Sequence, residues 1–312
     1  MIDLIGAPFD EGGRHKGSNL GPSAARLEGI LVGLEKIGRS ANDLGDVPRP
    51  SAQGTWNRAI ESFRQTKAEV VQSISKGNVP IVIGGDHSNS IASISGALAA
   101  YGSDLGVVWI DAHMDFNTPE SSPSGNLHGM SLAALCGLRS QKPEWNEILS
   151  QVVGSTKLDP KRIAWIGLRD VDRGEVENLG VSSGASPMTM QDVDALGIKE
   201  VWQGVFERLR SNGATAIWIS FDVDSLDPVF APGTGTAVRG GLTYREGHYL
   251  AELIHATLLA PNATARLAGV DVVEINPLID TSNQTARVAV EWVLSLFGKT
   301  ILHPLDPGRI ER

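Results

Sequence analysis

Three short segments of the chain concentrate acidic and histidine side chains. They are Gly85-Asp86-His87-Ser88, Asp111-Ala112-His113-Met114-Asp115 and Asp222-Val223-Asp224. In an extended chain, residues two positions apart point the same way, so each of the last two segments can direct its carboxylates to one side. Carboxylates held this close repel one another, and a divalent cation between them removes the repulsion. The residue types and their spacing therefore indicate metal binding.

The ligands on offer decide which metals suit such a site. They are carboxylate oxygens and imidazole nitrogens, which favour Mn²⁺, Mg²⁺, Fe²⁺, Co²⁺ or Zn²⁺ over copper(I) or iron–sulfur clusters. Six ligands are too many for one ion that must also hold water, and they suit two ions about 3.5–4 Å apart that share carboxylates. A hydroxide held between two such ions is a nucleophile at neutral pH. The candidate ligands are His87, Asp111, His113, Asp115, Asp222 and Asp224.

The elements that must position these ligands are short apolar runs rich in Val and Ile. Three of them, at 79–84, 106–110 and 215–221, come directly before the three segments. They are apolar at both odd and even positions, which is typical of strands covered on both faces. Further strands are expected at 2–6, 162–168 and 268–275, and weaker ones at 40–44 and 187–190. Helical periodicity predicts helices between them, at 22–37, 56–76, 91–101, 199–211, 243–259 and 282–297.

This alternation predicts the fold class, an α/β protein with one three-layer α/β/α domain and a mostly parallel sheet of about eight strands. Ligands of such sheets bind beyond the carboxyl ends of the strands, which is where the three segments lie. An aspartate at a strand end alone is often a turn former or a helix cap, so the joint pattern carries the metal hypothesis. We expect one catalytic domain over residues 1–312, with Asp192 and Asp194 in a surface turn and His15 without a functional partner.

The composition of the chain limits the kinds of partner that we expect it to bind. The chain has 312 residues, of which 20% are charged, and a formal net charge of −9. An acidic protein is a poor candidate for binding nucleic acid or an anionic membrane, because both interactions depend on Lys and Arg. No apolar run approaches the roughly 20 residues that span a bilayer. The N-terminal residues do not resemble a signal peptide and Cys136 is the one cysteine, so we expect a cytoplasmic protein.

The motifs resemble those of the ureohydrolase family, which includes arginases and agmatinases. The resemblance lies in Gly84-Gly-Asp-His-Ser88, Asp111-Ala-His-Met-Asp115 and Ser220-Phe-Asp-Val-Asp-Ser-Leu-Asp-Pro228. The arginase pattern is the most similar, because Asn117-Thr-Pro119, Ser124-Gly-Asn-Leu-His-Gly129 and Glu274-Ile-Asn-Pro277 follow in the same order. Lys16 departs from it, since arginases often place an arginine there, and the tail 303–312 has no match.

The resemblance implies a binuclear manganese hydrolase with two Mn²⁺ per chain. His87, Asp111, Asp115 and Asp222 would hold one ion, and Asp111, His113, Asp222 and Asp224 the other. Hydroxide between the ions would attack the guanidinium carbon of L-arginine, giving L-ornithine and urea. Glu274 would bind the guanidinium, His128 would shuttle a proton to the leaving amine, and Thr236 would orient the hydroxide. Family members are commonly homotrimers or homohexamers.

The resemblance also implies how the substrate's amino-acid end is read. Asn117 and Ser124 match positions that bind the α-carboxylate, and Asn126 shapes their loop. Asp172 matches the position that serves the ammonium, with Asp170 and Glu175 nearby. This loop favours L-arginine over agmatine, which lacks the carboxylate. The alternatives are a ureohydrolase for agmatine, 4-guanidinobutyrate or formiminoglutamate, and a non-catalytic binding protein on the same fold.

Overall fold

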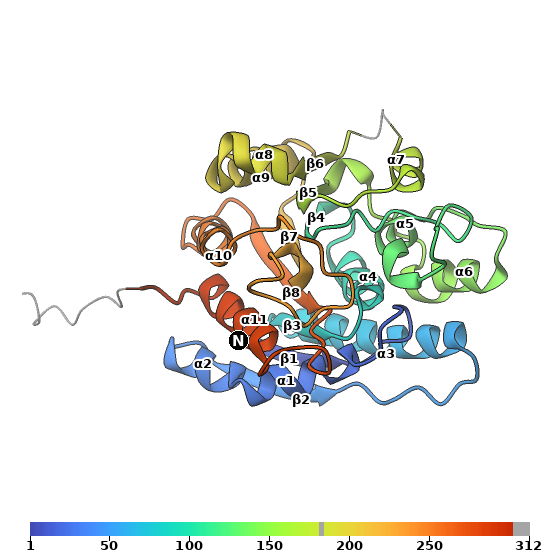
Figure 1. Ribbon diagram of the computed structural model, residues 1–312, viewed down its shortest axis with the longest axis horizontal. Coiled ribbons are helices and arrows are strands. Elements are labelled where there is room, and N and C mark those ends of the chain that lie inside the picture. The colour runs from blue at the N-terminus through green and yellow to red at the C-terminus, as the bar shows by residue number, and fades with distance from the viewer. Residues whose placement is uncertain (181–183, 302–312) are drawn as a thin grey trace, which may run out of the picture.

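The computed structural model describes residues 1–180 and 184–301, so the tail 303–312 lies outside the described part of the chain (Figure 1). Within that part, eight strands form one sheet in the order β2-β1-β3-β8-β7-β4-β5-β6, and every neighbouring pair is parallel. The strands are β1 (Ile2–Ala7), β2 (Ala41–Asp46), β3 (Val79–Gly84), β4 (Leu105–Ile110), β5 (Ile163–Leu168), β6 (Ser186–Thr189), β7 (Ala216–Asp222) and β8 (Arg266–Val273).

Helices cover both faces of the sheet, as Figure 1 shows on either side of the column of strands. One apolar core packs the sheet against α1 (Gly21–Leu27), α2 (Ile30–Lys36), α9 (Ile198–Ser211), α10 (Tyr244–Leu258) and α11 (Gln284–Leu296). A second core packs the other face against α3 (Thr55–Ser75), α4 (Ser90–Tyr101), α5 (Ser131–Leu135) and α6 (Pro143–Ile148). The expected three-layer fold with a parallel sheet is confirmed, because strands buried on both faces need helices on both sides.

Two expectations about helices were wrong. The segment 22–37 is divided into α1 and α2, because Gly29 takes a left-handed conformation with φ of 79° that interrupts the helix. Asp192 and Asp194 lie in α8 (Met190–Leu196) instead of a surface turn. The Thr189 side chain caps that helix by accepting from the Asp192 backbone, and the Asp192 carboxylate accepts in return from the Thr189 backbone.

The strand order explains how distant segments meet. Strands β3, β8, β7 and β4 are consecutive neighbours, so the residues that follow them lie at one edge of the sheet. In register, Ile110 pairs with Phe221, and Asp222 pairs with Val273. The segments after β4, β7 and β3 therefore converge, together with Glu274 after β8.

Candidate metal centre and active site

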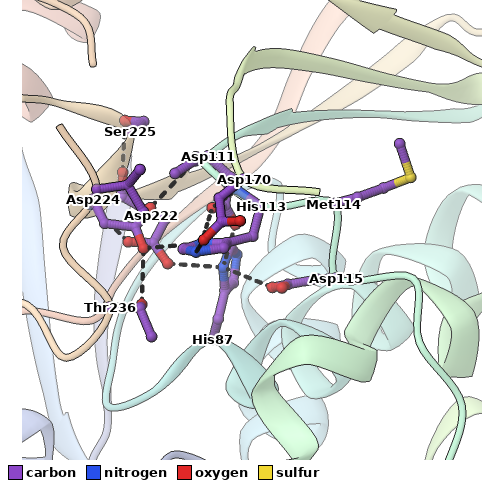
Figure 2. A network of polar contacts seen from close by, with 12 residues as sticks. His87, Asp111, His113, Met114, Asp115, Asp170, Asp222, Asp224, Ser225 and Thr236 are labelled. Carbon is purple, nitrogen blue, oxygen red and sulfur yellow. Dashed lines mark hydrogen bonds and ion pairs between the residues drawn. The ribbon is translucent and has the colours of Figure 1, made fainter. Parts of the chain in front are cut away.

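Five of the six predicted ligands form two overlapping groups at the carboxyl edge of the sheet. His87, Asp111 and Asp115 make one group, and Asp111, His113 and Asp224 make the other, each with ligand atoms within 4.8 Å of one another. Asp111 belongs to both groups. Figure 2 shows these side chains, which come from the segments after β3, β4 and β7, pointing toward a common centre. The arrangement is the one expected for two ions that share a carboxylate.

His87 faces three carboxylates with one ring nitrogen. Its Nδ1 lies 2.9 Å from Asp111 Oδ2, 3.0 Å from Asp222 Oδ2 and 3.2 Å from Asp115 Oδ2. That buried nitrogen has no hydrogen-bond partner in the described residues. A buried polar atom without a partner costs free energy, and a cation here would accept its lone pair. The residues therefore fit a bound divalent metal.

The second group is built in the same way. His113 Nδ1 lies 3.2 Å from Asp224 Oδ2 and 3.3 Å from Asp111 Oδ1. Thr236 donates to Asp224 Oδ2 over 2.9 Å and so fixes that carboxylate from outside the group. Asp170 lies farther away, with 3.8 Å between its Oδ2 and His113 Nε2 and a side chain that is 67% exposed. Thr236 is thus placed to orient a ligand, and Asp170 lies at the rim.

Burial and close contact between like charges shift the pKa values of the metal-free cluster. Burial, together with repulsion from Asp111, raises the pKa of Asp115 well above its ordinary value. The pKa of Asp222 rises for the same reasons, with Asp224 as the larger source of repulsion. Burial opposes a charge on His87, but the nearby carboxylates of Asp111 and Asp222 outweigh it and raise the pKa of His87. The cluster thus holds protons that divalent cations would displace.

Glu274 and His128 form a buried pair beside this cluster. Glu274 Oε1 lies 2.9 Å from His128 Nδ1 and accepts a 3.0 Å hydrogen bond from the His87 backbone nitrogen. Burial opposes charge on both side chains, but their mutual hydrogen bond outweighs it, lowering the pKa of Glu274 and raising that of His128. Glu274 has a φ of 64° and Asp115 one of 52°, left-handed values that cost free energy in residues other than glycine. The fold thus holds a charged pair and two strained residues at one site.

The remaining predicted residues lie around a cavity of about 390 Å³ above the cluster. Asn117 Nδ2 donates to Asp172 Oδ2 over 2.7 Å, and Ser121 Oγ donates to Asn117 Oδ1. Ser124 is exposed at the rim, where its Oγ accepts from the Asn126 backbone nitrogen. The structure therefore brings all six predicted substrate residues to one cavity: Asn117, Ser124, Asn126, Asp170, Asp172 and Glu175.

Asp172 and Glu175 have a second, structural part to play. They form the capping box of α7 (Arg173–Leu179), in which each carboxylate accepts from the other residue's backbone nitrogen. Glu175 also accepts a 3.3 Å hydrogen bond from the Phe116 backbone nitrogen. The same two carboxylates therefore cap α7 and line the cavity. Through Glu175 they also connect α7 to the segment after β4.

Sequence reasoning missed part of the lining. Arg14 and His15 line the cavity, although no partner was expected for His15. Their loop is held by Asp86, whose Oδ2 accepts from the backbone nitrogens of Gly12 and Gly13. Burial and repulsion from Glu274 raise the pKa of Asp86 to about 6. The signal was available in the two adjacent glycines, which let a backbone approach a buried carboxylate closely.

Glu175 gives the metal-free protein a pH-dependent stability. Burial raises its pKa from 4.5 to about 7, so the folded protein binds this proton more tightly than the unfolded chain. The contribution is present below pH 4.5 and is lost as pH rises through about 7, a change of about 3 kcal/mol. Glu175→Gln removes the titration, so its free energy of unfolding should fall less across this range. Urea denaturation of both metal-free proteins at several pH values measures the difference, and parallel profiles would contradict it.

The parallel sheet covered by helices and the His/Asp cluster at its carboxyl edge together indicate a hydrolase that binds metal. The sequence model of a family described as the Arginase family matches residues 1–298. A curated arginase from Staphylococcus aureus strain COL is 40% identical, with 96% of this chain and 98% of the relative covered. The chain therefore belongs to the arginase family.

Solved structures agree with this assignment. The crystal structure of arginase from Bacillus subtilis is 35% identical with a TM-score of 0.87, covering 97% of this chain and all of that one. Proclavaminate amidino hydrolase from Streptomyces clavuligerus is 26% identical with a TM-score of 0.71, covering 95% of this chain and 90% of that one. Proteins with differently named substrates thus share the fold, which leaves substrate choice to the cavity.

Proposed function

We propose that the protein hydrolyses L-arginine to L-ornithine and urea. The observation that carries the proposal is that one cavity joins the double His/Asp cluster to the loop with Asn117, Ser124 and Asp172. The cluster suits attack by water on a guanidinium carbon, and the loop suits the amino-acid end of the substrate. The names of the relatives support the same reaction.

Two ions held by the six ligands would supply a water that is deprotonated near neutral pH. The side chains then have separate tasks. Glu274 accepts hydrogen bonds from the planar guanidinium, which a carboxylate binds strongly. His128, whose pKa is raised by its hydrogen bond with Glu274, donates a proton to the amine of ornithine as the C–N bond breaks. Thr236 holds Asp224, and with it one edge of the ligand set.

The other end of the substrate carries a carboxylate and an ammonium. Asn117 uses one of its two amide hydrogens on Asp172, so the other is available to the carboxylate, as is the Ser124 hydroxyl. Asp172, Glu175 and Asp170 supply acceptors for the ammonium. Arg14 also lines the cavity and adds one positive charge to a lining that is rich in carboxylates. This division of donors and acceptors matches an α-amino acid.

Ser124→Ala tests this assignment with little risk to the fold, because the side chain is exposed. Losing one hydrogen bond to a charged group should raise KM for L-arginine about tenfold. Agmatine has no carboxylate, so its KM, or its inhibition constant, should not change. Initial rates with each compound check this. An equal loss for both compounds would assign Ser124 to the loop structure and contradict a carboxylate contact.

The reaction itself is tested by a urea assay with Mn²⁺ and separate portions of L-arginine, agmatine and 4-guanidinobutyrate. Urea from L-arginine alone, abolished by a chelator, is the expected result. Urea from another guanidino compound would keep the metal mechanism and replace the substrate. Binding without urea from any compound would favour a binding protein.

The cofactor we propose is two Mn²⁺ per chain. Carboxylate and imidazole ligands suit manganese, but they also suit neighbouring divalent metals. Metal analysis of protein purified without added metal, followed by activity with Mn²⁺, Co²⁺, Fe²⁺ and Zn²⁺ in turn, identifies the ion. Manganese should be the metal retained and the one giving the highest rate.

We also propose that residues 1–312 form one catalytic domain that assembles as a homotrimer or homohexamer in the cytoplasm. Leu27 and Val32, 84% and 52% exposed, offer apolar surface to a second copy. Cys136 is free, as is usual in a reducing compartment. We propose no nucleic-acid or membrane partner, in keeping with the net charge of −9. In the part of the chain that the structure describes, no helix is long and apolar enough to cross a membrane.

A further inference from the structure

A buried carboxylate lies behind His87, on the side away from the metal centre. Asp271 on β8 has no exposed surface and no ion pair with a Lys or Arg in residues 1–180 and 184–301. Its Oδ1 accepts from Ser220 Oγ at 2.5 Å and Ser90 Oγ at 3.0 Å. Its Oδ2 accepts from Ser93 Oγ at 2.5 Å and Trp218 Nε1 at 2.8 Å. Four donors on a buried carboxylate leave it acting only as an acceptor.

The direction of the hydrogen bonds follows from this arrangement. A serine hydroxyl has one hydrogen, and Ser220 donates it to Asp271. Ser220 Oγ also lies 2.9 Å from His87 Nε2, and with its hydrogen already used it can only accept there. Ser90 Oγ lies 3.2 Å from Ser220 Oγ and does not change this, because Ser90 donates its own hydrogen to Asp271 Oδ1. A Ser220 hydrogen turned toward Ser90 instead of Asp271 would still leave Ser220 an acceptor toward His87. The hydrogen of neutral His87 is therefore on Nε2.

The opposite ring nitrogen of His87 then carries the lone pair. That nitrogen, Nδ1, is the buried atom that faces Asp111, Asp115 and Asp222 at the metal centre. The imidazole also stacks on Trp109, with ring centroids 3.9 Å apart, which fixes the plane of the ring. The hydrogen bond at Nε2 then selects the tautomer. Partners behind a metal-binding histidine commonly set its tautomer and increase its basicity.

We propose that Asp271 is a positioning residue that acts through Ser220 to hold His87 with its Nδ1 lone pair toward one of the two metal ions. The inference rests on the proposed metal site, but not on the identity of the substrate. A merely structural role for Asp271 would affect the stability of the sheet without distinguishing the two ions. The positioning role predicts a selective effect on the ion that His87 binds.

Asp271→Asn is the sharpest test, because the shape of the side chain is kept. The Trp218 nitrogen can only donate, so the asparagine oxygen stays at that end and the amide nitrogen replaces Oδ1. The amide then donates to Ser220, and Ser220 turns its own hydrogen toward His87 Nε2. This reverses the tautomer and places a hydrogen on Nδ1. Affinity for one of the two Mn²⁺ should fall roughly 10–100-fold, as for other lost partners behind metal ligands.

Manganese titrations of the metal-free protein against a competing chelator measure the two affinities without relying on activity. Ser93→Ala is the matched control, because it removes a donor from the other oxygen of Asp271 and leaves the relay to His87 unchanged. It should lower the melting temperature of the metal-free protein but leave both metal affinities unchanged. The expected result is that Asp271→Asn loses affinity for one of the two Mn²⁺ ions and that Ser93→Ala loses affinity for neither.

Ser220→Ala completes the test and serves if Asp271→Asn does not fold. Ser220→Ala should lower the affinity for the same ion. Adding Asp271→Asn to it should lower that affinity no further, because the two residues act in series. Wild-type affinity for both ions in Asp271→Asn, an equal loss at both sites, or additive losses in the double variant would overturn the proposal. Absence of urea from L-arginine with normal metal binding would overturn the proposed reaction instead.

Discussion

Asp222→Asn is expected to abolish urea production and metal binding while leaving the metal-free fold at least as stable as the wild type. The two effects have opposite signs because the same charge causes both. Burial and repulsion from Asp224 and Asp111 raise the pKa of Asp222, so its charged form is unfavourable when no metal is present. An amide removes that charge. It also keeps the Oδ1 acceptor used by the Asp224 backbone nitrogen.

The loss of activity should exceed the roughly 10–100-fold that follows from losing a partner behind a metal ligand, because Asp222 is itself a proposed ligand. Metal content, urea formation and melting temperature with a chelator provide the three measurements. Asp3→Asn is a control with the opposite expectation. Asp3 is equally buried, at 2%, but it accepts from Asn42 and Asn78, so its replacement should destabilise the fold and leave the metals in place. Retention of both ions in Asp222→Asn would contradict the ligand assignment.

Glu274→Gln should reduce kcat/KM for L-arginine by about 10²–10³, as for loss of one polar contact that stabilises a transition state. The amide still has an oxygen for the His87 backbone, so metal content should remain normal. The carboxylate that raises the pKa of His128 is gone, so the pKa of His128 should fall. The limb of the pH–rate profile that reports His128 should therefore move to lower pH.

Kinetics across pH and metal analysis of the same preparation check this prediction. Glu246→Gln is the control, since Glu246 accepts from Thr243 at the exposed start of α10 and is not among the residues that line the cavity. It should change stability slightly and activity not at all. Loss of metal in Glu274→Gln would show that the residue supports the ligand set instead of the substrate.

The strands and the metal-ligand segments can be predicted from the sequence because each is defined by residues that are close together in the chain. Each Val/Ile-rich run is a strand, and the acidic and histidine segments directly follow β3, β4 and β7. Parallel pairing then brings the carboxyl ends of the strands to one edge of the sheet, where ligands far apart in sequence can meet. The capping box of Thr243 and Glu246 at the start of α10 is local in the same way, because its two residues lie three positions apart.

Other features depend on contacts that spacing does not encode. The break at Gly29 separates α1 from α2 because a single glycine takes a left-handed conformation, which periodicity does not show. The short helices α5, α6 and α7 have five to seven residues, too few for a hydrophobic period to stand out. In the sequence, Asp271 is a single polar residue within an apolar strand, and nothing in the spacing indicates its partners. Its donors come from α4 and β7, and only the folded sheet brings them together.

The all-parallel sheet gives the molecule one reactive edge and one inert edge. Every proposed ligand follows a carboxyl end, while the turns that lead into the strands, such as those at Gly77, Gly102 and Gly213, lie at the opposite edge. Lys76 and Ser103, which neighbour Gly77 and Gly102 in two of these turns, are exposed. The turns at that edge are therefore natural anchoring points for immobilising the protein on a bead or electrode. A tether attached there would leave the cavity mouth facing the solution, and a sensor built in this way would not obstruct its own substrate.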